Sequence, residues 1–371
     1  MTVCSLAYWT LVFQFPLDWR GVLMDTDQGQ GDTSAKEQYM NKIAVLGLGN
    51  FGTALARNWS QHGKPVHGWT VEQEVYDTIV ESGVNSKYFA GFDLPGLKVT
   101  MGLAESVRDA GVVALALPSH VVLSVVDDVI VHLSEGQVLL DLAKGLAPGG
   151  QLVSRAIHEK LDAAGKSNAV AVMTGPTIAP ELAAGVLTTA LVACEDEAIA
   201  SRLAGELTTP TFTISHAGDP LGIELWGAFK NVIALACGMS DGLSLVGGLG
   251  GDNLKAAIFT AGFREGCNLL DRLGAGRETA LSPAGVGDLF VTATSPHGRN
   301  RRTGELLGSG QNLEEALGST VMVSEGVRAT RMFAERLETP DEAPFVTTLK
   351  ACLDGELQAE QCVRQLINKN R

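Results

Sequence analysis

The most constraining feature of the chain is a short apolar run that leads directly into closely spaced glycines. Residues 43–52 read Ile-Ala-Val-Leu-Gly-Leu-Gly-Asn-Phe-Gly, and an apolar helical pattern follows. This pattern is typical of a buried parallel strand that turns into the N-terminus of a helix. In such a turn Gly47 allows the tight bend, Gly49 admits a pyrophosphate, and Gly52 lets helix and strand pack closely. The motif predicts a dinucleotide site; the alternative is a glycine-rich turn without a ligand.

The first half of the chain alternates between strand-like and helix-like segments. Helical patterns separate the apolar runs, for example at residues 121–133 and 151–161. This alternation predicts right-handed crossovers and a doubly wound parallel sheet of the Rossmann-like α/β class, covered by helices on both faces. Strands are expected at residues 42–46, 66–69, 110–117, 138–142, 169–173, 190–194 and 211–214.

From about residue 219 the pattern becomes helical, and no convincing strand is expected after residue 220. We therefore predict three parts: an extension at residues 1–40 that is disordered or an unused upstream start, a dinucleotide-binding domain at 41–217, and an all-α substrate domain at 218–371. Helices of the last domain are expected at residues 223–239, 254–273, 313–317, 327–337 and 346–353.

Composition excludes several classes of protein. The formal net charge of −14 argues against non-specific binding of nucleic acid, which needs a basic surface. The apolar stretch at residues 4–17 is too short to span a bilayer and lacks a basic start, so neither a membrane span nor a signal peptide is expected. The six cysteines show no C-x-x-C spacing, which favours reduced thiols in a cytoplasmic protein without a metal site.

Two lysines stand where they can face a cleft between the domains. Lys144 follows the strand at 138–142, at the edge where open α/β sheets bind ligands. Lys230 lies inside a very apolar helical segment. Burial there would lower the pKa of its amine toward the range that suits proton transfer. The alternatives are a solvated Lys144 and a Lys230 whose amine reaches the surface.

Further candidates lie in three turns. Asp288, which follows glycines at 285 and 287, is placed to hold an ammonium or hydroxyl group. Residues 299–302 read Arg-Asn-Arg-Arg, and guanidinium groups bind phosphate oxygens in pairs; the alternative is a salt-bridged surface. Thr177 follows a strand and either lines a ligand site or caps a helix. We interpret His120 as a capping or surface residue.

Together these motifs resemble the NAD(P)-dependent glycerol-3-phosphate dehydrogenase family over roughly residues 42–335. The resemblance implies reversible reduction of dihydroxyacetone phosphate to sn-glycerol 3-phosphate by hydride from NADH or NADPH, which feeds glycerophospholipid synthesis. It rests on the glycine turn and on residues 84–88, 117–119, 143–145, 175–177, 227–234, 287–289, 299–302 and 324–327.

The resemblance also implies roles for individual residues. Lys230 would be the catalytic general acid in reduction and the base in oxidation. The substrate would be held by Lys144, Gly175, Thr177, Asn231, Asp288, Arg299 and Asn300. The cofactor would lie against Gly47, Gly49, Asn50, Phe51, Gly52, Lys144, Ala179, Arg299, Val323 and Glu325. Where the family often has a base for the 2′-phosphate of NADP, this chain reads Val-Glu at 71–72, so the choice between NAD and NADP stays open.

Two other functions stay open on sequence alone. One is a related 3-hydroxyacid or 6-phosphogluconate-type dehydrogenase, which pairs a glycine turn with a helical domain and a lysine. The other is a dinucleotide sensor without catalysis. For the favoured activity we expect a small phosphorylated substrate as partner and, by resemblance, a homodimer.

Overall fold

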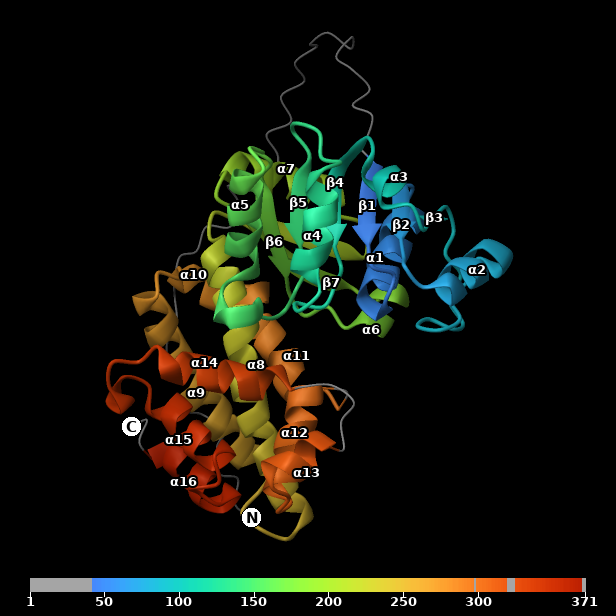
Figure 1. Ribbon diagram of the computed structural model, residues 1–371. Coiled ribbons are helices and arrows are strands. Elements are labelled where there is room, and N and C mark those ends of the chain that lie inside the picture. Colours follow the sequence, from blue (N-terminus) through green and yellow to red (C-terminus); the bar gives the residue numbers. More distant parts are fainter. Residues whose placement is uncertain (1–41, 297, 319–323, 369–371) are drawn as a thin grey trace, which may run out of the picture. The chain divides into compact units, whose positions relative to one another are not determined.

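The computed structural model describes residues 42–296, 298–318 and 324–368 of the chain (Figure 1). The extension expected at residues 1–40 and the predicted cofactor contact Val323 lie outside the described residues. The strands are β1 (Lys42–Leu46), β2 (Val66–Trp69), β3 (Lys98–Thr100), β4 (Ala110–Leu115), β5 (Val138–Asp141), β6 (Val170–Thr174), β7 (Thr188–Cys194) and β8 (Phe212–Ala217).

All eight strands form one sheet in the order β3-β2-β1-β4-β5-β6-β7-β8. The order steps outward from β1 in both directions, so the doubly wound arrangement is confirmed. The carboxyl ends of β1 and β4 lie side by side, because Leu46 is paired with Leu115. The edge strand β3 was not predicted, since it is only three residues long and carries the exposed Lys98.

One strand departs from the expected parallel sheet: β7 runs antiparallel to β6, with Met173 opposite Val192. The connection between them explains the difference. It contains only α6 (Ala179–Ala183), whose five residues extend about 7.5 Å at 1.5 Å per residue. This is too short to carry the chain back along the sheet, as a parallel crossover requires. The remaining neighbours in the sheet are parallel.

Helices cover both faces of the sheet (Figure 1). Alternate residues of β1 point to opposite sides: Val45 packs in the cluster that includes Trp59 of α1, and Leu46 in the cluster that includes Val126 of α4. The helices of this half are α1 (Asn50–Gln61), α2 (Gln73–Ser82), α3 (Leu103–Val107), α4 (Val122–Ile130), α5 (Val153–Ala163) and α7 (Glu197–Leu207), besides α6 and the 3₁₀ turn η2 (Pro148–Gly150).

The described elements after β8 are all helical, as predicted. They are α8 (Pro220–Leu245), α9 (Asp252–Arg272), α10 (Arg277–Ala280), the π-helical turn η3 (Pro283–Gly287), α11 (Asp288–Thr294), α12 (Arg299–Gly308), α13 (Leu313–Gly318), α14 (Glu325–Glu335), the 3₁₀ turn η4 (Pro340–Glu342), α15 (Pro344–Leu353) and α16 (Ala359–Asn368).

Helix α8 is the centre of this half and contacts α9, α11, α12 and α14. Among the described helices it alone is long and apolar enough to cross a membrane, but 94% of its apolar window is buried inside the fold. It therefore has the burial of a core helix. The pattern is hydrophobic all round, as expected for a helix enclosed by others.

Glycines bring α8 and α12 into backbone contact. A Cβ atom added at Gly238 would lie 1.9 Å from the carbonyl oxygen of Arg301, and one at Gly304 would lie 1.9 Å from that of Leu235. Larger residues at these positions would force the helices apart. The close packing places the start of α12 beside the middle of α8, where Lys230 lies.

The carboxylate of Asp219 links several segments at the beginning of the helical half. Asp219, which precedes α8, accepts hydrogen bonds from the amides of Gly222 and Gly276, both at 2.8 Å. It also accepts one from the hydroxyl of Thr279. The domain boundary that the sequence predicts, between residues 217 and 218, falls in the two-residue link between β8 and α8.

Candidate active site

The glycine turn lies at the carboxyl end of β1 and opens α1. Gly47 has a φ of +100°, which favours glycine, and a Cβ atom at Gly52 would lie 1.9 Å from the carbonyl oxygen of Gly47. Among the described residues, no atom lies within 4 Å of a Cβ added at Gly49. Open space therefore adjoins the N-terminus of α1, which starts at Asn50 and Phe51, and a pyrophosphate group fits there.

A buried ion pair lies between the middle of α8 and the start of α11. Lys230 is 2% exposed and Asp288 is 1% exposed, and the amine donates to Oδ2 of the carboxylate. Lys144 Nζ lies 3.5 Å from the same oxygen, and the hydroxyl of Thr174 donates to it at 3.1 Å. The alternative that the Lys230 amine reaches the surface is therefore wrong, because the amine is enclosed and paired.

The electrostatics of this pair suit proton transfer. Burial lowers the pKa of Lys230 from 10.5 to about 8, with Lys144 adding to the shift and Asp288 opposing it. Burial alone would raise the pKa of Asp288, but the ammonium groups of Lys144 and Lys230 hold it below its ordinary value. An amine with a pKa near 8 can give or take a proton near neutral pH, while its partner stays ionised.

Lys144 is held where the ends of β5 and β6 meet. Its amine donates to the carbonyl oxygen of Gly175 and to the hydroxyl of Thr177, both at 3.2 Å, and lies 5.8 Å from the ring centre of Phe51. Gly175 has no room for a side chain, because a Cβ atom there would lie 2.7 Å from the carbonyl oxygen of Thr189. Lys144 thus links the glycine turn to the ion pair.

A chain of amide hydrogen bonds orients two asparagines beside the lysine. Asn300 donates to the side-chain oxygen of Asn231 at 2.8 Å. Its own oxygen accepts from Ser324 Oγ and from the amide of Gly326, both at 2.9 Å. These contacts fix which way both amide groups point. Asn231 follows Lys230 directly on α8, so the network borders the ion pair.

Glu325 brings a second carboxylate to the cations. Burial raises its pKa, and the positive charges of Arg299, Lys230 and Lys144 oppose the shift, which places Glu325 within electrostatic range of all three. A Cβ atom at Gly145 would lie 3.1 Å from Glu325 Oε1 and 3.0 Å from Ser119 Oγ. The charge of Arg328 also opposes the rise in the pKa of Glu325, so four cations lie near the two carboxylates, and this excess of positive charge attracts a phosphate.

Not every basic or predicted residue joins this group. Arg301 pairs with Asp241 at 2.6 Å and with Glu305 at 3.0 Å, and Arg302 also pairs with Glu305. The salt-bridge interpretation of the arginine cluster therefore holds for Arg301 and Arg302. The predicted cofactor contact Ala179 begins α6, which packs beside α1.

The sequence interpretation missed two residues that shape the site. Thr174 bonds to Asp288, and Arg328 on α14 donates to the carbonyl oxygens of Leu146 and Ala147, which follow Lys144 in the chain. Thr174 stands directly before the Gly-Pro-Thr turn, so its place at a strand end was a usable signal. Arg328 had no such signal, because its partners are backbone atoms far away in the sequence.

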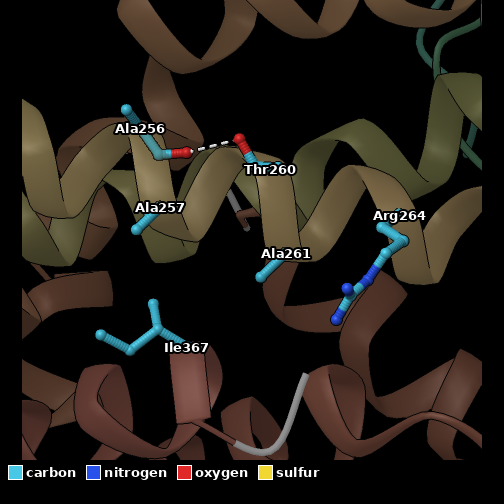
Figure 2. Close-up of a pocket in the computed structure, with 6 residues that line it drawn as sticks. All are labelled: Ala256, Ala257, Thr260, Ala261, Arg264 and Ile367. Atoms are coloured by element: carbon cyan, nitrogen blue, oxygen red, sulfur yellow. Dashed lines mark hydrogen bonds between the residues drawn. The ribbon is translucent and has the colours of Figure 1, made fainter. Parts of the chain in front are cut away.

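A separate hollow of about 400 Å³ lies on the helical half (Figure 2). Its lining comes from α9 and α16: Ala256, Ala257, Thr260, Ala261, Arg264 and Ile367. Figure 2 shows these side chains around the space between the two helices, with Ile367 on the α16 side. None of the predicted site residues lines it, so it is distinct from the lysine cluster.

Comparisons with known proteins show the family of the chain. Residues 42–200 match the family model described as the N-terminus of NAD-dependent glycerol-3-phosphate dehydrogenase, and residues 219–364 match that of its C-terminus. The glycerol-3-phosphate dehydrogenase [NAD(P)+] of Moorella thermoacetica is 41% identical over 291 residues, which cover 78% of this chain and 84% of that protein. The chain belongs to the glycerol-3-phosphate dehydrogenase family.

Other relatives support the assignment along most of the chain. The Xanthomonas euvesicatoria glycerol-3-phosphate dehydrogenase [NAD(P)+] is 35% identical over 336 residues, 90% of this chain and 96% of that protein. The crystal structure of glycerol-3-phosphate dehydrogenase from Coxiella burnetii has a TM-score of 0.77 at 30% identity, and covers 89% of this chain and 99% of that one.

As a glycerol-3-phosphate dehydrogenase, the protein is an oxidoreductase that interconverts dihydroxyacetone phosphate and sn-glycerol 3-phosphate with NAD or NADP as cofactor. These relatives favour this activity over the 3-hydroxyacid and 6-phosphogluconate alternatives and over a sensor. The expectations of a phosphorylated small substrate and a nicotinamide cofactor are confirmed.

Proposed function

We propose that Lys230 is the acid–base catalyst of this reaction. The observation that carries the proposal is the buried Lys230 amine, bonded to Asp288, beside Lys144, with a pKa of about 8. In this proposal residues 41–217 bind the dinucleotide and residues 218–371 supply the catalyst and much of the substrate site.

The bound nicotinamide supplies or accepts the hydride. During reduction, Lys230 donates a proton to the carbonyl oxygen of the substrate; during oxidation, the neutral amine takes the proton back. Asp288 orients the amine through Oδ2, and Lys144 adds positive charge where the alkoxide develops. The enclosed position of Lys230 excludes water, which strengthens each of these interactions.

We assign the phosphate and the hydroxyl groups of the substrate to the polar groups that converge on Lys230. Their donors suit phosphate and hydroxyl oxygens. They are Lys144, Gly175, Thr177, Asn231, Asp288, Arg299 and Asn300. On the cofactor side we propose Gly47, Gly49, Asn50, Phe51, Gly52, Lys144, Ala179, Arg299, Val323 and Glu325.

We also propose that the enzyme is a homodimer in the cytoplasm and feeds glycerophospholipid synthesis. Exposed apolar side chains at the turn between α8 and α9, namely Leu245, Val246 and Leu249, offer a surface for a second copy. The described cysteines are free thiols, as is usual in a reducing compartment. Light scattering tests the first point, since a monomeric mass at micromolar concentration would contradict it.

The catalytic proposal is tested by replacing Lys230 with alanine. We expect Lys230→Ala to lower turnover of dihydroxyacetone phosphate by roughly 10²–10⁴, while NADH affinity, followed by fluorescence, stays the same. Lys255→Ala is the matched control, because Lys255 on α9 also pairs with a carboxylate across a helix contact, that of Asp241 on α8, but lies outside the cluster. Full activity in Lys230→Ala would overturn the assignment.

A further inference from the structure

Two cysteines meet where the last two described helices pack together. Cys352 lies in the last turn of α15 and Cys362 in the first turn of α16. The thiol of Cys362 donates to the carbonyl oxygen of Thr348 at 3.7 Å. Thr348 is one turn before Cys352 on α15, so the same carbonyl accepts the Cys352 amide in the helix repeat.

The direction of helical side chains brings the two sulfur atoms together. A side chain on an α-helix leans toward the helix N-terminus and covers the preceding turn. The Cys352 thiol therefore lies over the Thr348 carbonyl, on which the Cys362 thiol already rests. Each thiol is also the largest influence on the pKa of the other, as this placement requires. The spacing in the sequence gave no hint of this, because the cysteines lie on different helices.

The two thiols differ in accessibility and in reactivity. Cys352 is partly exposed, whereas Cys362 is 0% exposed. The neighbouring Cys362 thiol lowers the pKa of Cys352, whereas the Cys352 thiol and burial both raise the pKa of Cys362. The accessible sulfur is thus the better nucleophile, with a second thiol behind it. Redox-sensitive cysteines are arranged in this way, with a reactive and a resolving partner.

We propose that Cys352 and Cys362 form a reversible disulfide that joins α15 to α16 under oxidation by a peroxide. The Cys352 thiolate attacks one oxygen of hydrogen peroxide; the O–O bond breaks, hydroxide leaves and takes up a proton, and a sulfenic acid remains. Cys362 then attacks this sulfur, the S–O bond breaks and a second water leaves. Two thiols lose two electrons and two protons, and the peroxide is reduced to water.

The bond would act on the docking of α16 rather than on the lysine cluster. Helix α16 packs against α8, α9 and α12, and Ile367 forms its side of the hollow in Figure 2. A covalent link to α15 restrains α16 in the unfolded chain as well as in the folded one. We therefore expect oxidation to raise Tm by a few degrees and to leave turnover within about twofold.

Peptide mapping of the full chain tests the proposal. No Lys or Arg separates the two cysteines, so trypsin releases both in the single peptide 351–364. After peroxide treatment and digestion without reductant, we expect this peptide to be lighter by two hydrogen atoms and closed to alkylation. Dithiothreitol should restore its mass and both alkylation sites.

Variants separate the pair from general oxidation. Cys352→Ser removes the mass loss and the rise in Tm without placing a new group in the core, and Cys362→Ala does the same from the buried side. Cys267→Ser, which changes a partly exposed cysteine on α9, should keep both effects. A Cys352 that ends as sulfinic acid, or that links to another chain while Cys362 stays alkylatable, would overturn the proposal.

Discussion

The two sides of the active site are built by opposite means. The side proposed for the nucleotide depends on missing side chains: Gly47, Gly49 and Gly52 leave room for backbone atoms and for a ligand. The side proposed for the substrate depends on the charged side chains of Lys144, Lys230 and Asp288, which come from the loop after β5, from α8 and from α11. The first kind of site can be recognised from ten consecutive residues, whereas the second exists only after the chain has folded.

The largest effect should come from removing the carboxylate that the two lysines share. Asp288→Asn leaves the enclosed amine of Lys230 without its counter-ion and removes one partner of the partly exposed Lys144. Breaking a buried pair costs about 3–5 kcal/mol of unfolding free energy. Asp127→Asn is the control, since its carboxylate is exposed and its pair with Lys160 is worth about 1 kcal/mol at most. Urea titration of both variants measures the difference. Equal losses of unfolding free energy would show that burial of the cluster does not make its ion pairs more important for stability.

Substitutions in the glycine turn should act through the volume of the added side chain and not through its charge. Gly52→Ala forces a Cβ atom against the carbonyl of Gly47, and overpacking of this kind costs about 1–3 kcal/mol. Gly49→Ala meets no described atom, so it should keep the stability of the parent and lose only nucleotide affinity. Thermal unfolding together with NADH titration distinguishes the two. Unchanged NADH affinity in Gly49→Ala would place the pyrophosphate elsewhere.

The pH dependence of turnover tests the lysine–aspartate cluster without changing any side chain. Because burial lowers the pKa of Lys230 to about 8, its protonated form is lost above that pH. Reduction needs the protonated amine and should fall above pH 8, about tenfold per unit. Oxidation needs the neutral amine and should rise up to pH 8 and then level off. In Asp288→Asn both midpoints should move to lower pH, because Asp288 raises this pKa; midpoints that stay in place would contradict the pairing.

The smallest effect concerns cofactor choice at the end of β2. Glu72 stands about 20 residues after the glycine turn, where an acid commonly binds the ribose 2′-hydroxyl. Its carboxylate accepts from Tyr88 Oη at 2.9 Å and pairs with Lys87. Glu72→Gln should raise the affinity for NADPH relative to NADH several-fold, because a 2′-phosphate would no longer meet this charge. Glu74→Gln is the control, and a ratio unchanged in both would exclude Glu72 as the determinant.

Much of the fold could be predicted from local patterns in the sequence. The strands β1, β4, β5 and β6 follow apolar runs that end in turn residues, and the helices α8 and α9 follow long apolar periodicities. The direction of β7 was not predictable in this way, because it depends on the length of α6 and not on the strand itself. The approach of α8 and α12 through Gly238 and Gly304 likewise needs both helices in place.

The candidate site likewise contains residues that local motifs predict and residues whose roles depend on distant contacts. The resemblance named Lys144, Lys230 and Asp288 from motifs, and the structure brings these three together. Thr174 and Arg328 lay outside the interpretation because their partners are a distant carboxylate and distant backbone carbonyls. The proximity of Cys352 and Cys362 was not predicted either, because the two residues lie on different helices.

The hydrogen bonds of Asp219 have a mechanical consequence. By joining the first turn of α8 to Gly276 and Thr279, this carboxylate makes the base of the helical half move as one block. Ile223 in this turn packs with Val172 of β6 and with Leu191 and Ala193 of β7, so the block rests directly on the sheet. The buried amine on α8 is therefore held in register with Thr174 at the end of β6, which bonds to the same carboxylate.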